Sequence, residues 1–209
     1  MINIKMIPVG ELEANCYFVV CADEAIVIDP GAPSKKLDSL IEAFGAKRLK
    51  YILLTHGHFD HIGYTAALKK KYPHTKIVIG EKDNSFTANS TLNLSLFFGD
   101  ECEPFTADIT VSDGDTLHFG DEEIKVMSTP GHTQGSVCYI IGNNIFSGDT
   151  LFCGTTGRMD FPTGSETEMM QSIKRLSELP GNPDIYCGHN SPTTLEREKK
   201  NNYAMRQFK

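Results

Sequence analysis

The stretch that decides the fold runs from Ile52 to Gly63 and reads ILLTHGHFDHIG. An apolar run ends at Leu54, and three histidines and one aspartate then fall within the six positions from His56 to His61. Side chains that can bind metal are hard to explain as packing when they stand this densely beside an apolar run. We therefore interpret the stretch as a buried strand that carries metal ligands at its end.

The spacing within this stretch indicates two metal ions. His56 and His58 are two residues apart, so in an extended turn both side chains can point to one side. Asp60 and His61 are neighbours in the chain, and neighbouring side chains normally point apart. They can therefore face two different points in space, and two metal ions a few Å apart would allow both side chains to bind metal. Because a zinc site takes about four ligands, two ions need more ligands than this turn supplies.

Three later segments supply the missing ligands. STPGHTQGS, FSGDTLF and YCGHNSP each follow a strand-like run and place a histidine or aspartate among glycines, where the backbone can approach a site closely. A hydroxide shared between the ions would complete both coordination shells. The seven predicted ligands are His56, His58 and His132 for one ion, Asp60, His61 and His189 for the other, and Asp149 as the bridge between them.

The surrounding chain repeats one order of elements. AIVIDPG, a helix from Ser34 to Gly45 and YILLTHGH give a strand ending in aspartate, a helix and a strand ending in histidine. NIFSGDT, a helix that begins at Ser165 and DIYCGHN follow the same order. Open α/β sheets place their sites at the carboxyl ends of strands. Two such halves predict two facing sheets with helices outside, and we expect one domain over residues 1–209 because no linker interrupts them.

The composition narrows the class of protein. Hydrophobic residues make up 40% and charged residues 22% of the chain, which is ordinary for a globular protein. The net charge of −7 argues against a nucleic-acid partner, and no apolar run approaches the length of a membrane span. The N-terminal MINIKMIPVG lacks the features of a secretory signal.

The six cysteines contain no C-x-x-C pair and four lie in strand-like runs, so we expect reduced thiols and a cytoplasmic location. The oligomeric state is left open.

The motifs resemble those of a known family. THGHFDH is similar to the T-H-x-H-x-D-H motif of the metallo-β-lactamase superfamily, and TPGHTQGS, SGDTLF and CGHNSPTT resemble its later ligand motifs in the same order. The resemblance spans nearly the whole chain. It implies an α/β fold, a four-layer αββα sandwich of two mixed sheets with helices outside, and metals at one sheet edge. GDTLFCGTTGRMDFPTGS resembles the glyoxalase II-like branch, the hydroxyacylglutathione hydrolases and their short relatives.

This branch implies a dinuclear hydrolase of small thioesters, with S-lactoylglutathione split into lactate and glutathione. The ions would be zinc, with iron or manganese as alternatives, and the shared hydroxide would attack the thioester. Asp60 would orient the hydroxide and accept its proton. A thiolate leaves readily, since thiols have a pKa of about 8.5. Two alternatives stay open: a mononuclear iron persulfide dioxygenase, and a metal-binding member without catalytic activity.

Other residues are candidates for supporting roles. Arg158 could bind a substrate carboxylate or simply pair with Asp160. Phe97 and Phe98, in the stretch 83–105 that shows no clear period, could close over the acyl group. Two residues at strand ends could either orient ligands or serve only the structure, namely Asp29 and Thr55.

The end of the chain bears on glutathione binding. The resemblance implies that longer hydroxyacylglutathione hydrolases hold the tripeptide with a C-terminal helical extension. Here only residues 190–209 follow His189, enough for one helix in TTLEREKKNNYAM, whose basic and acidic residues nearly balance. We therefore expect these charges to form a solvated face. We also expect weak saturation by S-lactoylglutathione and tolerance of other small thioesters.

Overall fold

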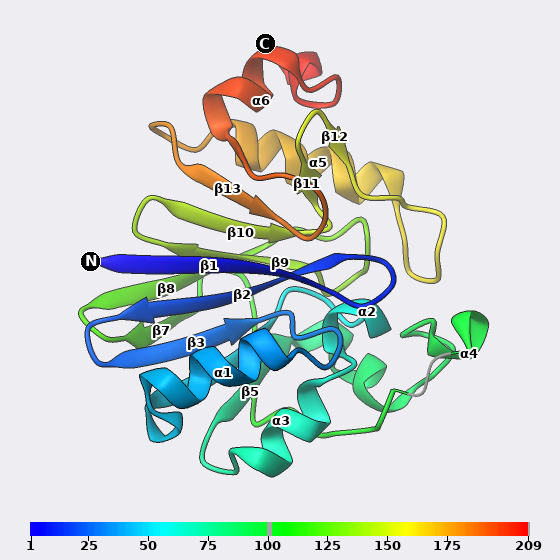
Figure 1. The fold of residues 1–209 in the computed structure, drawn as a ribbon. Helices are drawn as coiled ribbons and strands as arrows, with labels where there is room; N and C mark the ends of the chain where they lie inside the picture. Colours follow the sequence, from blue (N-terminus) through cyan, green and yellow to red (C-terminus); the bar gives the residue numbers. More distant parts are fainter. Residues whose placement is uncertain (100–101, 209) are drawn as a thin grey trace.

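Two six-stranded mixed sheets pack face to face, with helices on their outer sides (Figure 1). This computed structural model describes residues 1–99 and 102–208, so residues 100 and 101 of the predicted 83–105 stretch lie outside the described residues. The arrangement confirms the predicted αββα sandwich with two mixed sheets.

The first sheet combines a β-meander with parallel strands. Its strands, in spatial order, are β1 (Ile2–Val9), β2 (Ala14–Cys21), β3 (Glu24–Ile28), β4 (Leu49–Leu54), β5 (Lys76–Gly80) and β6 (Ile109–Val111). The first three strands pair antiparallel, and β3 to β6 pair parallel. The segments between the parallel strands contain α1 (Lys35–Phe44), η1 (Ala46–Arg48), α2 (Phe59–Ile62), α3 (Thr65–Lys71), η2 (Glu81–Ala88) and α4 (Ser95–Phe98).

The second sheet has one parallel pair. Its spatial order is β14 (Thr193–Thr194), β13 (Asp184–Cys187), β10 (Asn144–Gly148), β9 (Val137–Ile141), β8 (Glu122–Ser128) and β7 (Thr116–Phe119). Among the described strands of this sheet, only β10 and β13 run parallel, and α5 (Glu166–Ser177) lies between them in the chain. A small hairpin of β11 (Leu151–Phe152) and β12 (Thr155–Thr156) follows β10, and the chain ends in α6 (Leu195–Asn201) and η3 (Met205–Phe208).

Successive side chains of a strand point to opposite faces of the sheet and join different apolar clusters. In β3, Val27 joins the cluster under α1, whereas Ile26 and Ile28 join the cluster between the sheets. Both clusters are buried, so β3 has no polar face, as expected of a strand covered on both sides. A third cluster packs α5 against the second sheet. Burial of apolar surface on both faces of each sheet therefore fixes where the strand ends meet.

Two predicted helix caps are confirmed. The Ser34 and Ser165 hydroxyls accept hydrogen bonds from the first turns of α1 and α5, so both helices begin where the sequence indicated. All six cysteines are free thiols, and Cys16, Cys21, Cys138 and Cys187 are buried in strands. Within residues 1–99 and 102–208, every helix is too short or too polar to traverse a bilayer.

The C-terminal helix exposes Glu196, Arg197 and Lys200, as expected of a solvated face, but not Glu198. Glu198 of α6 is fully buried, and its carboxylate accepts hydrogen bonds from the Gly154 N–H, the Thr193 hydroxyl and the Asn202 amide. Lys199 donates to the Leu179 carbonyl. The helix thus braces the β11–β12 hairpin, a role that its charge pattern alone did not reveal.

Candidate metal centre

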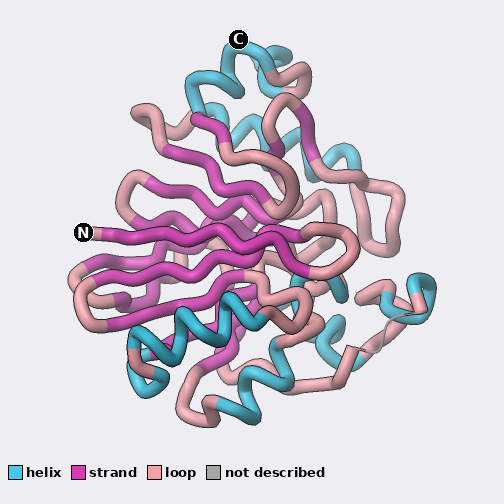
Figure 2. Tube along the Cα trace, viewed as in Figure 1, coloured by secondary structure: helices cyan, strands magenta, loops and turns pink. Residues whose placement is uncertain are grey.

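The seven predicted ligands meet where the parallel strands end. Figure 1 shows α2 beside these strand ends, and Figure 2 shows the longer loops of the molecule at the same end. β4 leads into the loop of His56 and His58, while the short helix α2 carries Asp60 and His61. The remaining ligands follow three strands of the second sheet: His132 after β8, Asp149 after β10 and His189 after β13.

The first group consists of His56, His58 and His132, whose ligand nitrogens all lie within 4.8 Å of one another. His58 Nδ1 and His132 Nε2 are 2.9 Å apart. Burial, followed by the neighbouring histidines, lowers the pKa of both His56 and His58 well below its usual range. These imidazoles are therefore neutral, which is the form that binds metal.

The second group consists of Asp60, His61 and His189. Asp60 Oδ2 lies 3.5 Å from His61 Nε2 and 3.3 Å from His189 Nε2. Our expectation that Asp60 and His61 point apart is wrong, because residues 59–62 form a helical turn that brings both side chains to the same point. Their shared point nevertheless agrees with their assignment to one ion.

Asp149 joins the two groups. Its Oδ1 lies 3.4 Å from His61 Nε2, and its Oδ2 lies 3.5 Å from His132 Nε2. The adjacent glycine is required, because Gly148 has a φ of +49° and a Cβ there would lie 2.3 Å from Thr55 Oγ1. A Cβ at Gly188 would likewise lie 2.1 Å from Asp149 Oδ1. These close approaches explain the glycines that flank the later ligands.

The donor set fits divalent cations. His56 Nε2 and Asp149 Oδ1 are buried, and neither has a hydrogen-bond partner among the described residues. Burial lowers the pKa of His61, but the carboxylates of Asp60, Asp149 and Asp29 outweigh burial and raise it to about 10. A positive charge is thus favoured at this point, and imidazole and carboxylate are ligands that zinc and related ions accept.

Asp29 and Thr55 contact the ligands directly. Asp29 accepts hydrogen bonds from the Thr55 N–H at 2.8 Å and hydroxyl at 2.6 Å, and its Oδ2 lies 3.0 Å from His61 Nδ1. Thr55 Oγ1 lies 3.1 Å from His56 Nδ1. Such contacts fix the orientation of an imidazole, so the geometry favours the ligand-orienting interpretation of these two residues. Asp29 also lies with His56 and His61 in a group whose ligand atoms are all within 4.8 Å of one another.

Asp83 is a residue of the site that the sequence did not reveal. It is fully buried at the start of the aperiodic stretch, directly after β5 and within η2. Its carboxylate accepts hydrogen bonds from Gly57, Thr133 and Gly135. Burial raises the pKa of Asp83 to about 6, against the lowering effect of these donors. The only signal in the sequence is an aspartate placed just beyond a strand end.

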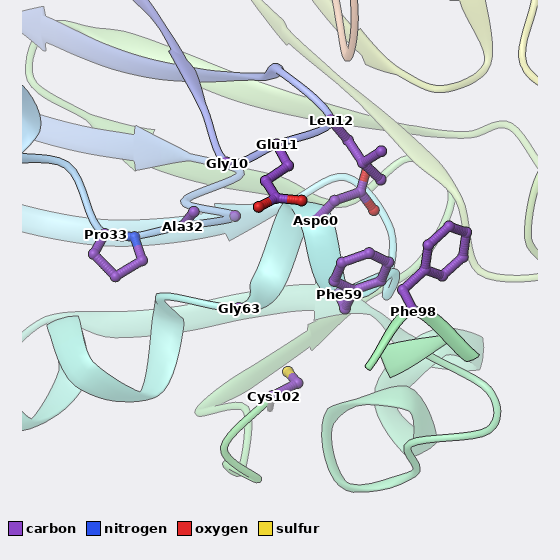
Figure 3. A pocket seen from close by; sticks show the side chains of 11 residues that line it. Gly10, Glu11, Leu12, Ala32, Pro33, Phe59, Asp60, Gly63, Phe98 and Cys102 are labelled. Carbon is purple, nitrogen blue, oxygen red and sulfur yellow. The ribbon is translucent and has the colours of Figure 1, made fainter. Parts of the chain in front are cut away.

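A cleft of about 430 Å³ opens onto the ligands. Its lining side chains that are not predicted ligands are Leu12, Phe59, Leu94, Phe98, Phe152, Arg158 and Phe161. A second cavity, of about 270 Å³, shares Leu12, Phe59, Asp60 and Phe98 with it. Figure 3 shows the rings of Phe59 and Phe98 side by side near Asp60; their centroids are 5.1 Å apart. The cleft is therefore mainly apolar around a polar floor.

The predicted substrate contacts differ in position. Phe98 lines the cleft, whereas Phe97 is 65% exposed and lies outside the set of described residues that line it. Arg158 also lines the cleft, but both oxygens of Asp160 accept hydrogen bonds from its guanidinium at 2.7 Å. The same guanidinium lies 3.8 Å from the centre of the Phe161 ring.

Comparisons with known proteins agree with this geometry. The sequence model of the metallo-beta-lactamase superfamily matches residues 9–189. The hydroxyacylglutathione hydrolase GloC of Haemophilus influenzae is 34% identical over 206 residues, with 96% of each chain covered. The crystal structure of the BLEG-1 B3 metallo-beta-lactamase is similar with a TM-score of 0.86 and 31% identity, covering 98% of this chain and 99% of that one. TTHA1623 in a di-iron-bound form has a TM-score of 0.84 and 30% identity, covering 95% and 98%.

The chain therefore belongs to the metallo-beta-lactamase superfamily, as its motifs indicated. Its relatives support a metal-dependent hydrolase and do not favour the persulfide dioxygenase.

Proposed function

We propose that this protein is a dinuclear metal-dependent hydrolase of small thioesters. One observation carries the proposal: Asp149 lies between the two groups of ligands, with Oδ1 3.4 Å from His61 and Oδ2 3.5 Å from His132 and 3.7 Å from His189. A carboxylate in this position suits a pair of ions better than a single ion. We propose zinc, and the di-iron form of a similar protein supports iron as an alternative.

The bound ions and Asp60 would have different roles in hydrolysis. When bound, divalent ions lower the pKa of water so that hydroxide forms near neutral pH, and they polarise a carbonyl. Burial raises the pKa of Asp60, but His61 and His189 outweigh burial and hold the pKa below its usual range. Asp60 is therefore an anion that can orient the attacking oxygen by accepting a hydrogen bond, and it lines the cleft where a thioester would lie.

The substrate class is proposed from the cleft and the relatives. The hydroxyacylglutathione hydrolase from Haemophilus influenzae supports S-lactoylglutathione as a substrate. The apolar rim suits the acyl and thiol chains of a thioester, and water then yields a carboxylic acid and a free thiol. Arg158 is held by Asp160, so it offers little free charge to the carboxylates of glutathione. We therefore propose weak saturation by S-lactoylglutathione and tolerance of other small thioesters.

A panel of thioesters tests the proposed function. Release of free thiol is measured for zinc-loaded protein with S-lactoylglutathione and with small thioesters that lack glutathione, and Asp149→Ala protein controls for contaminating hydrolases. We expect turnover of several thioesters, with a KM for S-lactoylglutathione no lower than for the others. A chromogenic β-lactam and a persulfide under oxygen complete the panel, because efficient turnover of either one without thioester turnover would overturn the proposal.

A further inference from the structure

We infer that Asp83 is a positioning residue that holds the three-histidine group of His56, His58 and His132 in its ligand geometry. The inference rests on the metal centre of the proposed function and not on its substrate. Asp83 contacts none of the seven predicted ligands itself through a hydrogen bond among the described residues. It acts on the backbone and side chains next to them.

The carboxylate of Asp83 connects ligand loops from the two sheets. Its Oδ2 accepts from the Gly57 N–H at 2.9 Å and from the Thr133 hydroxyl at 2.6 Å, and its Oδ1 accepts from the Gly135 N–H at 2.8 Å. Gly57 lies between His56 and His58 in the loop after β4, and Thr133 directly follows His132 in the loop after β8. One side chain thus fixes the relative position of all three histidines.

Close packing places both loops directly against the segment that carries Asp83. A Cβ at Gly57 would lie 2.4 Å from the Phe86 Cβ, and a Cβ at Gly135 would lie 2.3 Å from the Asp83 nitrogen. The backbone of each loop is therefore pressed against the segment that begins with Asp83. A buried carboxylate with three donors is also costly to remove, because its donors would remain unpaired.

Asp29 and Asp83 hold different ligands, so loss of Asp83 should affect the binding of one ion more than that of the other. Asp29 contacts His61 directly and reaches His56 through Thr55. Asp83 shares no hydrogen-bond partner with Asp29 within the described part of the chain. Loss of Asp83 should therefore weaken the ion held by the three histidines and spare the one held by Asp60, His61 and His189.

Stepwise metal dissociation constants test this inference. Zinc is titrated into metal-free protein against a chelator of known affinity, and cobalt spectra report the coordination of each ion. The variants are Asp83→Asn, which keeps one acceptor oxygen, Asp83→Ala, which keeps none, and Thr133→Val, which removes one donor. The control is Glu198→Gln, because Glu198 is equally buried, accepts three hydrogen bonds and lies away from the histidine group. His132→Ala identifies which constant belongs to the three histidines.

We expect Asp83→Asn to raise that constant roughly 10- to 100-fold and to leave the other within a few-fold of wild type. Asp83→Ala should raise it further, and Thr133→Val should raise it less. Unchanged constants in Asp83→Asn and Thr133→Val would overturn the inference, as would equal weakening of both ions in Asp83→Asn and Glu198→Gln. If wild-type protein binds no metal pair at all, the proposed function fails instead.

Discussion

Asp149 is the residue on which the proposed pairing of two ions rests. Its Oδ1 lies 3.4 Å from His61 and its Oδ2 lies 3.5 Å from His132, so its carboxylate reaches both groups. Asp29 also lies within 4.8 Å of the ligand atoms of His56 and His61, but it is not among the described residues that line the cleft. Asp60 lies at the second group only, beside His61 and His189. Replacement of Asp149 and replacement of Asp60 should therefore have different effects on metal binding and on activity.

We predict that Asp149→Ala lowers the occupancy of both ions and reduces kcat/KM by more than the roughly 100-fold that loss of an outer hydrogen-bond partner costs. Asp60→Asn keeps an oxygen near the second group but loses the negative charge that orients the attacking oxygen, so it should mainly reduce kcat, by about 100-fold or more. Elemental analysis and steady-state kinetics of both variants check this. Normal occupancy and good turnover in Asp149→Ala would show that the bridge is assigned wrongly.

At the scale of elements, α4 and the start of α2 shape the cleft. Phe98 of α4 stacks on Phe59 of α2, with ring centroids 5.1 Å apart and planes inclined by 30°. Both rings line the main cleft and the second cavity. Phe97, the neighbouring residue, is 65% exposed.

We predict that Phe98→Ala weakens the selection among acyl groups, because it removes an apolar wall from the cleft. KM should rise roughly tenfold for thioesters with larger apolar acyl groups and less for acetyl thioesters. Phe97→Ala is the matched control and should change KM less, since its side chain is mostly in solvent. Steady-state kinetics over a series of acyl lengths measure both. A larger effect of Phe97→Ala would place that residue, and not Phe98, over the acyl group.

At the scale of the whole molecule, the candidate metal centre joins the two sheets. Ligands follow β4 of the first sheet and β8, β10 and β13 of the second. Ions bound there would hold strand ends together across the sandwich, and ligands that bind only the folded state stabilise it by mass action.

We predict two ions per chain and a marked loss of stability when they are removed. Elemental analysis after preparation with excess metal should give a ratio near two. Chelation should lower the free energy of unfolding by about 2.7 kcal/mol for each ion that was present at about 100 times its Kd. Denaturation by urea with and without chelator measures this, and readdition of zinc is the control. A stable ratio of one with full activity would contradict the dinuclear site.

The sequence by itself determined the order of elements and the identity of the predicted ligands. Strand periodicity, helix caps and glycines act over a few residues, so the strand before His56 and the caps at Ser34 and Ser165 could be predicted. The parallel order of strand, helix and strand predicted that Asp149 and His189 lie at one sheet edge, because right-handed crossovers bring such strands together.

Only the tertiary structure decided the contacts between distant segments. The helical turn at residues 59–62 brings Asp60 and His61 to one point, and no periodicity predicts a turn so short. Asp83 connects loops that are 26 and 50 residues away from it, and Glu198 connects to a hairpin 44 residues away. A buried carboxylate is stable only where donors from other elements surround it, and those donors are brought together by the packing of the two sheets.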